Sequence, residues 1–133
     1  MRRKTFSVLA VLAIFGVFYL TLQSAEETTA LTGKAIDWLL KFGITVQPKI
    51  LRHDIHYVEY AVLGFFLYMS MRNARAIPVA ALIGLLDEGI KVLLPTREFD
   101  FTDLLRDIVG AAAVIGILML LEACCIKEKT RSR

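Results

Sequence analysis

Residues that could do chemistry recur at helical spacing in the middle of this chain. His56, Glu59 and Tyr60 stand at positions i, i+3 and i+4, so a helix would hold them on one face. An imidazole beside a carboxylate suits general acid–base catalysis, and the same two groups are ligands for divalent metal ions. This face is therefore the first candidate for a functional site.

Two later stretches combine acidic and basic residues. Asp87 and Glu88 precede Lys91 by four and three positions, so its ammonium group can reach both carboxylates on a helix. Asp103 and Asp107 stand one helical turn apart on a single face. The arginines near these acids are Arg52, Arg97 and Arg106. Arginine binds phosphate and carboxylate groups through two parallel hydrogen bonds, so an anionic ligand is one partner that this set would accept.

Four apolar segments are available to position these residues. They are long enough to span the hydrocarbon of a bilayer, and they occupy residues 5–23, 50–71, 77–94 and 103–126. Pro78 suits the first turn of the third segment, and Pro95 ends it. The first segment shares its basic start with secretory signal peptides. Its apolar core exceeds their usual length of about 7–15 residues, which favours an uncleaved helix.

A polar stretch follows the first apolar segment and becomes amphipathic around residues 35–42. Ile36, Leu39 and Leu40 recur there at helical spacing beside Trp38, a residue that favours the headgroup level. The sequence therefore predicts an all-α fold, a four-helix transmembrane bundle with a short interfacial amphipathic helix between its first two spans. The length allows a single domain over residues 1–133.

The composition agrees with a membrane protein. Hydrophobic residues make up 56% of the chain, above the roughly 45–50% of soluble domains. No cluster of Lys and Arg is interleaved with aromatic residues, so a nucleic-acid partner is not expected. Cys124 and Cys125 are adjacent and lack metal-binding or redox spacing. Four spans place both termini on one side, where Lys and Arg are more numerous, so the positive-inside rule predicts cytoplasmic termini and an outward polar cluster.

The charged residues within the apolar segments have two interpretations. A charge at the bilayer centre costs about 2.5–3.5 kcal/mol or more, so such residues usually mark a functional site. The alternative is a structural network of salt bridges. In that network Arg52, Lys91, Arg97 and Arg106 would neutralise Glu59, Asp87, Glu88, Asp103 and Asp107. The number of costly groups favours a site over a scaffold.

Two motifs in the chain resemble those of VanZ-like membrane proteins. The first reads Arg52-x-x-Ile55-His56-Tyr57-x-Glu59-Tyr60-Ala61-x-Leu63-Gly64. The second reads Asp87-Glu88, then Pro95-x-Arg97, then Asp103-x-x-x-Asp107-x-x-Gly110. The stretch from Phe18 to Ser24, followed by Glu26-Glu27, is also similar to the end of the family's first helix. The resemblance covers almost the whole chain, which is therefore identified as a single VanZ-like domain.

This resemblance implies a multi-pass protein of the bacterial cell membrane. Founding members of the family are associated with resistance to the glycopeptide teicoplanin, which acts outside the membrane, on the side where the polar cluster is expected. One departure affects the candidate site. The family usually has Gln three positions after the Glu of the Asp-Glu pair, often preceded by His, whereas this chain has Ile90 and Lys91. Lysine can neutralise the acids where glutamine only hydrogen-bonds, so a different or weaker mode of ligand binding is expected.

The first functional hypothesis is a non-enzymatic envelope protein that binds a lipid-linked cell-wall component or a lipid headgroup at the outer face. Arg52 and Arg97 would hold a phosphate or carboxylate group, and the acids would orient these arginines. The candidate ligand-binding residues are Arg52, His56, Glu59, Tyr60, Asp87, Glu88, Arg97, Asp103 and Asp107. Close helix packing is expected at Gly84, Gly89, Gly110 and Gly116, and a homo-oligomer is a further alternative.

The second hypothesis is an intramembrane hydrolase or transferase that acts on a lipid-linked substrate. His56 would be the general base, with Glu59 orienting it or donating protons, and the acids could hold a divalent metal as cofactor. The catalytic candidates are His56, Glu59, Asp87 and Glu88, although the chain has no GxSxG or HExxH motif. A third hypothesis is proton or ion transport. It is weakened because the half of each span toward the cytoplasm is almost wholly apolar.

Overall fold

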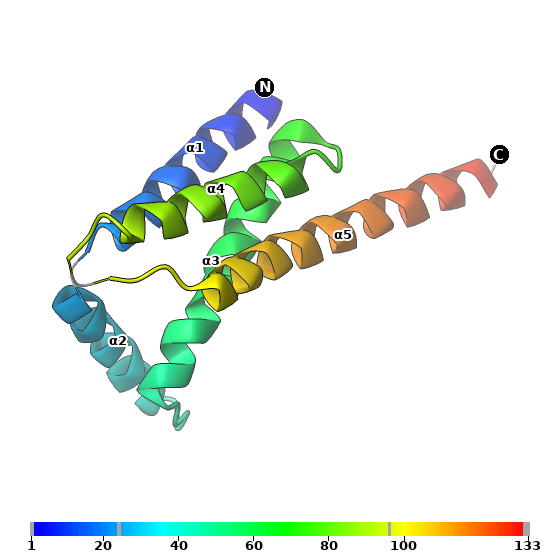
Figure 1. Ribbon diagram of the computed structural model, residues 1–133. Coiled ribbons are helices and arrows are strands. Elements are labelled where there is room, and N and C mark those ends of the chain that lie inside the picture. Colours follow the sequence, from blue (N-terminus) through cyan, green and yellow to red (C-terminus); the bar gives the residue numbers. More distant parts are fainter. Residues whose placement is uncertain (1, 24, 96, 132–133) are drawn as a thin grey trace.

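The computed structural model describes residues 2–23, 25–95 and 97–131, which form five α-helices with no strand among them. In chain order these are α1 (Arg2–Thr21), α2 (Ala25–Leu40), α3 (Pro48–Met71), α4 (Ala76–Lys91) and α5 (Phe101–Arg131) (Figure 1). The predicted all-α class is confirmed.

Local sequence explains where the longer helices begin and end. Pro48 occupies the first turn of α3, where a backbone N–H is not needed. After α3, Arg72 adopts a left-handed conformation with φ of 56°, and its N–H donates to the Tyr68 carbonyl at 2.6 Å. Before α5, the carboxylate of Asp100 accepts the N–H of Thr102 at 2.7 Å and so caps the start of that helix.

α3 is the central helix and packs against each of the other four. α4 also packs against α1 and α5, while α2 lies across one end of the other four helices (Figure 1). The core between them contains buried apolar side chains such as Val17, Tyr60, Leu63, Ala80 and Ile115. α1 and α4 end, and α3 and α5 begin, at the end that α2 covers, so residues far apart in the sequence meet there.

At the opposite end of the bundle, polar contacts join α1 and α5 to the last turn of α3. The side chain of Arg3 on α1 donates to the Ser70 carbonyl at 2.9 Å. Glu122 on α5 accepts the Tyr68 hydroxyl at 2.7 Å and pairs with Arg72. The beginning of α1 and the later half of α5 therefore lie at the same end of the bundle.

Two glycines permit the close approach of α3 and α5. A Cβ added to Gly110 would lie 2.5 Å from the carbonyl oxygen of Tyr57. One added to Gly64 would lie 2.9 Å from the Cα of Ala111. Both neighbours are backbone atoms, which cannot rotate away, so the crossing of these helices requires glycine at both positions.

The other glycines expected at helix contacts divide into two groups. Gly84 faces α5, because its added Cβ would lie 3.3 Å from the Leu104 side chain. Gly89 and Gly116 have no such neighbour within 4 Å among the described residues. The packing prediction is therefore correct for Gly84 and Gly110 and wrong for the other two, which face away from the neighbouring helices.

Two helices of the described chain are long and apolar enough to cross a membrane, Arg3–Thr21 of α1 and Phe101–Cys125 of α5. The predicted four-helix transmembrane bundle is therefore not confirmed as such. α4 has 16 residues, a length of about 24 Å at 1.5 Å per residue, which is less than the roughly 30 Å hydrocarbon core. α3 is longer, but charged residues interrupt its first half.

The helix predicted between the first two apolar segments is present, but its predicted range is too short. The amphipathic pattern indicated residues 35–42, whereas α2 spans Ala25–Leu40. Glu26 and Glu27 in its first turn interact favourably with the helix dipole, which helps a polar stretch to be helical. Gly43, with φ of 74°, turns the chain after α2 toward α3.

Candidate functional site

Polar side chains from α1, α3, α4 and α5 converge at the end of the bundle that α2 covers. We call this group the polar cluster. Four of its charged side chains are almost fully buried: Asp87 is 2% exposed, Glu88 0%, Lys91 5% and Asp107 0%. The sequence-predicted residues that meet here are His56, Glu59, Tyr60, Asp87, Glu88, Asp103 and Asp107. Burying this many charges is costly unless each one is paired or hydrogen-bonded.

His56 bridges two carboxylates on one face of α5. Its Nδ1 lies 3.0 Å from Asp107 Oδ1, and its Nε2 lies 3.5 Å from Asp103 Oδ2. Asp103 is shared with His53, whose Nδ1 lies 3.2 Å from Oδ1. The prediction that Glu59 orients His56 is wrong, because the buried Asp107 makes that contact from the neighbouring helix.

The adjacent acids Asp87 and Glu88 have different partners. Asp87 accepts a hydrogen bond from Thr21 of α1, and Glu88 pairs with Lys91 on its own helix. The second oxygen of Glu88 accepts the backbone N–H of Asp100 at 3.1 Å, which joins α4 to the segment before α5. The spacing predicts that Lys91 reaches both acids, but the hydrogen bond that it forms is with Glu88.

Arg97 does not bind the acids as the sequence suggested. It donates to the Gln23 carbonyl at 2.9 Å and to the Thr28 hydroxyl, so it joins the turn between α1 and α2. The arginine that pairs with Asp103 is Arg106, at 2.5 Å. In the described contacts no acid orients Arg97, so that prediction is wrong. The salt-bridge network expected of a structural scaffold would have included Arg97, and this residue is not part of it.

A cavity of about 360 Å³ lies beside the polar cluster, beneath α2. Its polar wall includes His56, Glu59, Asp87, Lys91, Arg97 and Asp103. Its apolar wall includes Leu20, Leu31, Ala35, Leu51 and Ile55. The cavity is therefore lined by both charged and aliphatic groups.

Several buried polar atoms around this cavity have no hydrogen-bond partner in the described structure. They are Gln23 Oε1, Glu59 Oε1, Tyr60 OH, Arg97 Nε and Asp107 Oδ2. Buried polar groups in folded proteins are almost always hydrogen-bonded, and exceptions are typical of sites that bind water, an ion or a ligand. Gln23, Glu59 and Arg97 line the cavity, which therefore has the unsatisfied polar groups of a binding site.

Some residues of the site were not expected from the sequence. Thr21, Gln23 and Thr28 contact its charged residues, although none of them was predicted to take part. Thr21 and Gln23 lie in the stretch that resembles the end of the family's first helix, and this resemblance was the sequence feature that could have indicated their part in the site. Among the predicted residues, Arg52 lies on α3, but its side chain falls outside the described part of the structure.

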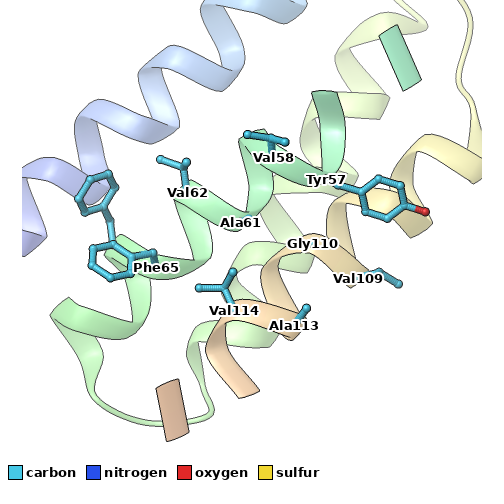
Figure 2. A pocket seen from close by; sticks show the side chains of 10 residues that line it. Tyr57, Val58, Ala61, Val62, Phe65, Val109, Gly110, Ala113 and Val114 are labelled. Atoms are coloured by element: carbon cyan, nitrogen blue, oxygen red, sulfur yellow. The ribbon is translucent and has the colours of Figure 1, made fainter. Parts of the chain in front are cut away.

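A larger hollow, of about 630 Å³, lies between α3 and α5 (Figure 2). Its walls are aliphatic or aromatic, as shown by Val58, Val62, Phe65 and Val114. Tyr57 contributes the one hydroxyl group among its lining residues. This groove offers van der Waals contact without polar recognition, so the groups capable of chemistry are those around the cavity beneath α2.

The polar cluster contains groups for two kinds of chemistry. His56 and Asp107 form a histidine–carboxylate pair, which is the arrangement that orients an imidazole for proton transfer. His56, Glu88 and Asp107 also present ligand atoms that all lie within 4.8 Å of one another, as a metal ion would require. The histidine–carboxylate pair and the set of metal ligands both depend on the distance between α3, which carries His56, and α5, which carries Asp107.

Comparison with known families decides what kind of protein carries this site. The sequence profile of the VanZ/LLP1 family matches residues 6–122, a range that includes every residue of the polar cluster. The chain belongs to the VanZ/LLP1 family. The resemblance seen in the two motifs is thereby confirmed. The VanZ/LLP1 profile covers α2, α3 and α4 completely, together with most of α1 and the first two-thirds of α5. Comparison with the curated proteins gave no match, and neither did comparison with the solved structures.

Proposed function

We propose that this VanZ/LLP1 protein is a multi-pass protein of the bacterial cell membrane that binds a lipid in the cavity beneath α2. The bound part would be a lipid headgroup or the polar head of a lipid-linked envelope component. The observation that carries the proposal is the set of buried, unpaired polar atoms in this cavity. A ligand that supplies their partners would remove a cost of about 1–3 kcal/mol for each atom.

The unpaired atoms define the polar chemistry of the ligand. Arg97 Nε is a donor, so it favours a phosphate or carboxylate oxygen. Glu59 Oε1 in an ionised carboxylate is an acceptor, so it favours a hydroxyl or amine. A phosphorylated sugar or glycerol headgroup carries both kinds of group, whereas a simple inorganic anion carries one.

The apolar surroundings favour a lipid over a free polar molecule. Leu20, Leu31 and Ile55 line the cavity together with its charged residues. At the end of α2, Trp38 and Phe42 are exposed and lie with ring centroids 4.8 Å apart, which suits the headgroup level of a membrane. An interfacial α2 would put the cavity at the depth of lipid headgroups, where a lipid can enter from the side.

The exposed surface of the longer helices supports a membrane location for the whole chain. Large apolar side chains such as Phe15, Leu82 and Leu120 are more than half exposed on three different helices. An apolar surface of this extent is typical of contact with lipid. With cytoplasmic termini, the cavity would open at the outer face, where binding of a cell-wall precursor would alter susceptibility to teicoplanin.

The experiment uses the purified full chain in detergent and measures its thermal unfolding midpoint with added lipids. Undecaprenyl-linked sugar phosphates and anionic phospholipids are compared with phosphatidylcholine. We expect the first two classes to raise the midpoint. Glu59→Gln keeps the size of the side chain and removes its charge. It should weaken binding about tenfold, since a hydrogen bond to a charged group contributes about 1.5–3 kcal/mol.

The matched control is Glu98→Gln, which removes an exposed carboxylate from the segment between α4 and α5. It should bind lipid as the wild type does. A midpoint that does not depend on the headgroup, or an equal loss in both variants, would contradict the proposal.

An intramembrane hydrolase or transferase is the second candidate, favoured by the 3.0 Å contact between His56 Nδ1 and Asp107. In this case His56 would act as general base and the buried Asp107 would orient it. The same lipid samples distinguish the candidates. A cleaved lipid product that disappears with His56→Gln would identify an enzyme, and recovery of intact lipid after long incubation would argue against one.

A further inference from the structure

We infer that the buried end of the polar cluster binds one divalent transition-metal ion through His56, Glu88 and Asp107. These residues come from α3, α4 and α5, and their ligand atoms all lie within 4.8 Å of one another. The inference does not rest on the proposed lipid ligand, because it concerns the cation alone. The two are tested with different probes.

The distances within the cluster suit a metal ion. His56 Nδ1 and Asp107 Oδ1 are 3.0 Å apart. Two ligand atoms that each lie about 2.1 Å from an ion are about 3.0 Å apart in an octahedral site and about 3.4 Å apart in a tetrahedral one. This pair therefore already has the spacing of neighbouring ligands. The ligand atom of Glu88 lies within 4.8 Å of the other two, so it would have to approach by up to about 1.8 Å to reach the spacing of a neighbouring ligand.

The charge balance of the buried cluster also favours a cation. Asp87, Glu88 and Asp107 are each exposed by 2% or less. Among the described residues, Lys91 is the one buried lysine or arginine, at 5% exposure. When all three carboxylates are ionised, they exceed the one ammonium by two charges, which a single divalent ion would balance. An unbalanced buried charge is strongly destabilising, and a bound cation is one way to balance it.

The unpaired oxygen of Asp107 is a separate indication of a ligand. Asp107 is 0% exposed, and its Oδ1 contacts His56, whereas Oδ2 has no hydrogen-bond partner in the described structure. Glu59 Oε1 and the Tyr60 hydroxyl are also buried without a partner. A carboxylate can bind one ion through both oxygens, so an ion held by Asp107 Oδ1 would also give Oδ2 a partner, and a water ligand of that ion would donate to the Tyr60 hydroxyl.

The donor set points to the class of metal. One imidazole and two carboxylates suit Zn²⁺ or Mn²⁺, whereas Mg²⁺ and Ca²⁺ prefer oxygen ligands alone. Lys91 is the competitor of the ion in this chain, because its ammonium group already pairs with Glu88. Removing that ammonium group should therefore strengthen metal binding.

The experiment is equilibrium dialysis of the full chain in detergent, without an affinity tag, against Zn²⁺, Mn²⁺ or Mg²⁺, followed by elemental analysis. We expect one Zn²⁺ or Mn²⁺ per chain and weaker binding of Mg²⁺. Asp107→Asn should weaken binding at least about tenfold, a loss that even changes outside the ligand shell can cause. Asp54→Asn, an exposed acid on the same helix as His56, is the matched control and should bind as the wild type does.

Lys91→Gln keeps the inference testable even if Asp107→Asn does not fold. It removes a unit charge beside Glu88 and should strengthen binding about tenfold or more. A gain of affinity cannot arise from misfolding. A wild-type chain that retains no metal would overturn the inference, as would a folded Asp107→Asn variant with unchanged affinity or a Lys91→Gln variant with weaker binding.

Discussion

Asp100 connects the start of a helix to the polar cluster. Its carboxylate accepts the N–H of Thr102 at 2.7 Å, and its own N–H donates to Glu88 at 3.1 Å. The hydrogen bond from the Thr102 backbone favours the ionised form and holds the pKa of Asp100 below its ordinary range. One residue outside the long helices therefore both begins α5 and fixes a buried acid of α4.

Replacing Asp100 tests this role. Asp100→Ala removes the helix cap and should lower the free energy of unfolding by about 1 kcal/mol. A lowered pKa in the folded state stabilises the fold above the pKa of the unfolded chain, and this contribution is lost as pH falls. The advantage of the wild type over Asp100→Ala should therefore decrease below about pH 4. The difference in stability between the two proteins is measured by thermal unfolding at several pH values, followed by circular dichroism.

Asp100→Asn is the matched control, because asparagine caps helices about as well as aspartate without a charge. It should unfold close to the wild type at neutral pH and show less dependence on acid. An Asp100→Ala variant as stable as the wild type at neutral pH would show that the cap does not support α5.

The contact between α3 and α5 determines the site at the scale of elements. His56 lies on the first helix, and Asp103 and Asp107 lie on the second, so their distances follow from how closely the helices approach. Gly110 sits one turn after Asp107 and lets the backbone of α3 come near. Because Gly110 and Asp107 lie one turn apart on α5, a change in how closely α3 packs at Gly110 would also change the distance between His56 and Asp107.

Gly110→Ala should destabilise the protein by about 1–3 kcal/mol, because its Cβ would lie 2.5 Å from the backbone oxygen of Tyr57. Gly116→Ala is the control on the same helix, where no neighbouring atom lies within 4 Å. It should leave stability unchanged or raise it by up to about 1 kcal/mol, since alanine favours helices over glycine. Thermal unfolding midpoints that fall equally in both variants would contradict the role of this crossing.

At the scale of the whole molecule, the beginning of α1 and the later half of α5 lie at the end opposite the cavity. In the proposed membrane orientation, both termini would lie on one side and the proposed lipid site on the other. In that orientation the polar cluster, which comes from α1, α3, α4 and α5, would lie at one face of the bilayer. This arrangement places the costly charges near water and headgroups rather than at the bilayer centre.

The two cysteines give a direct test of orientation. Cys124 and Cys125 are exposed on the later half of α5, so in the proposed topology they lie toward the cytoplasm. A membrane-impermeant maleimide should label them only after the cell membrane is permeabilised. The control is Glu98→Cys in a chain with Cys124→Ser and Cys125→Ser, which should be labelled in cells with an intact membrane. The reverse pattern of labelling would overturn cytoplasmic termini.

The helical class and the identity of most site residues could be predicted because they depend on local sequence. Apolar segments and Pro48, Pro78 and Pro95 locate helices, since the period of apolar residues and the geometry of proline act over one or two turns. The same spacing correctly places the residues of one helix on a common face. Burying a charge is costly, so charged faces are expected to converge, and those containing His56, Asp87 and Asp107 do.

The partners across helices could not be predicted, because they depend on how the helices rotate and cross. Asp107 rather than Glu59 contacts His56, and Arg97 binds the turn between α1 and α2 instead of an acid. Thr21 reaches Asp87 only because α1 packs beside α4. The sequence by itself determined the helices, the family and the side-chain inventory. The tertiary structure decided the pairing and the cavity, since a spacing along one helix contains no information about the angle to the next.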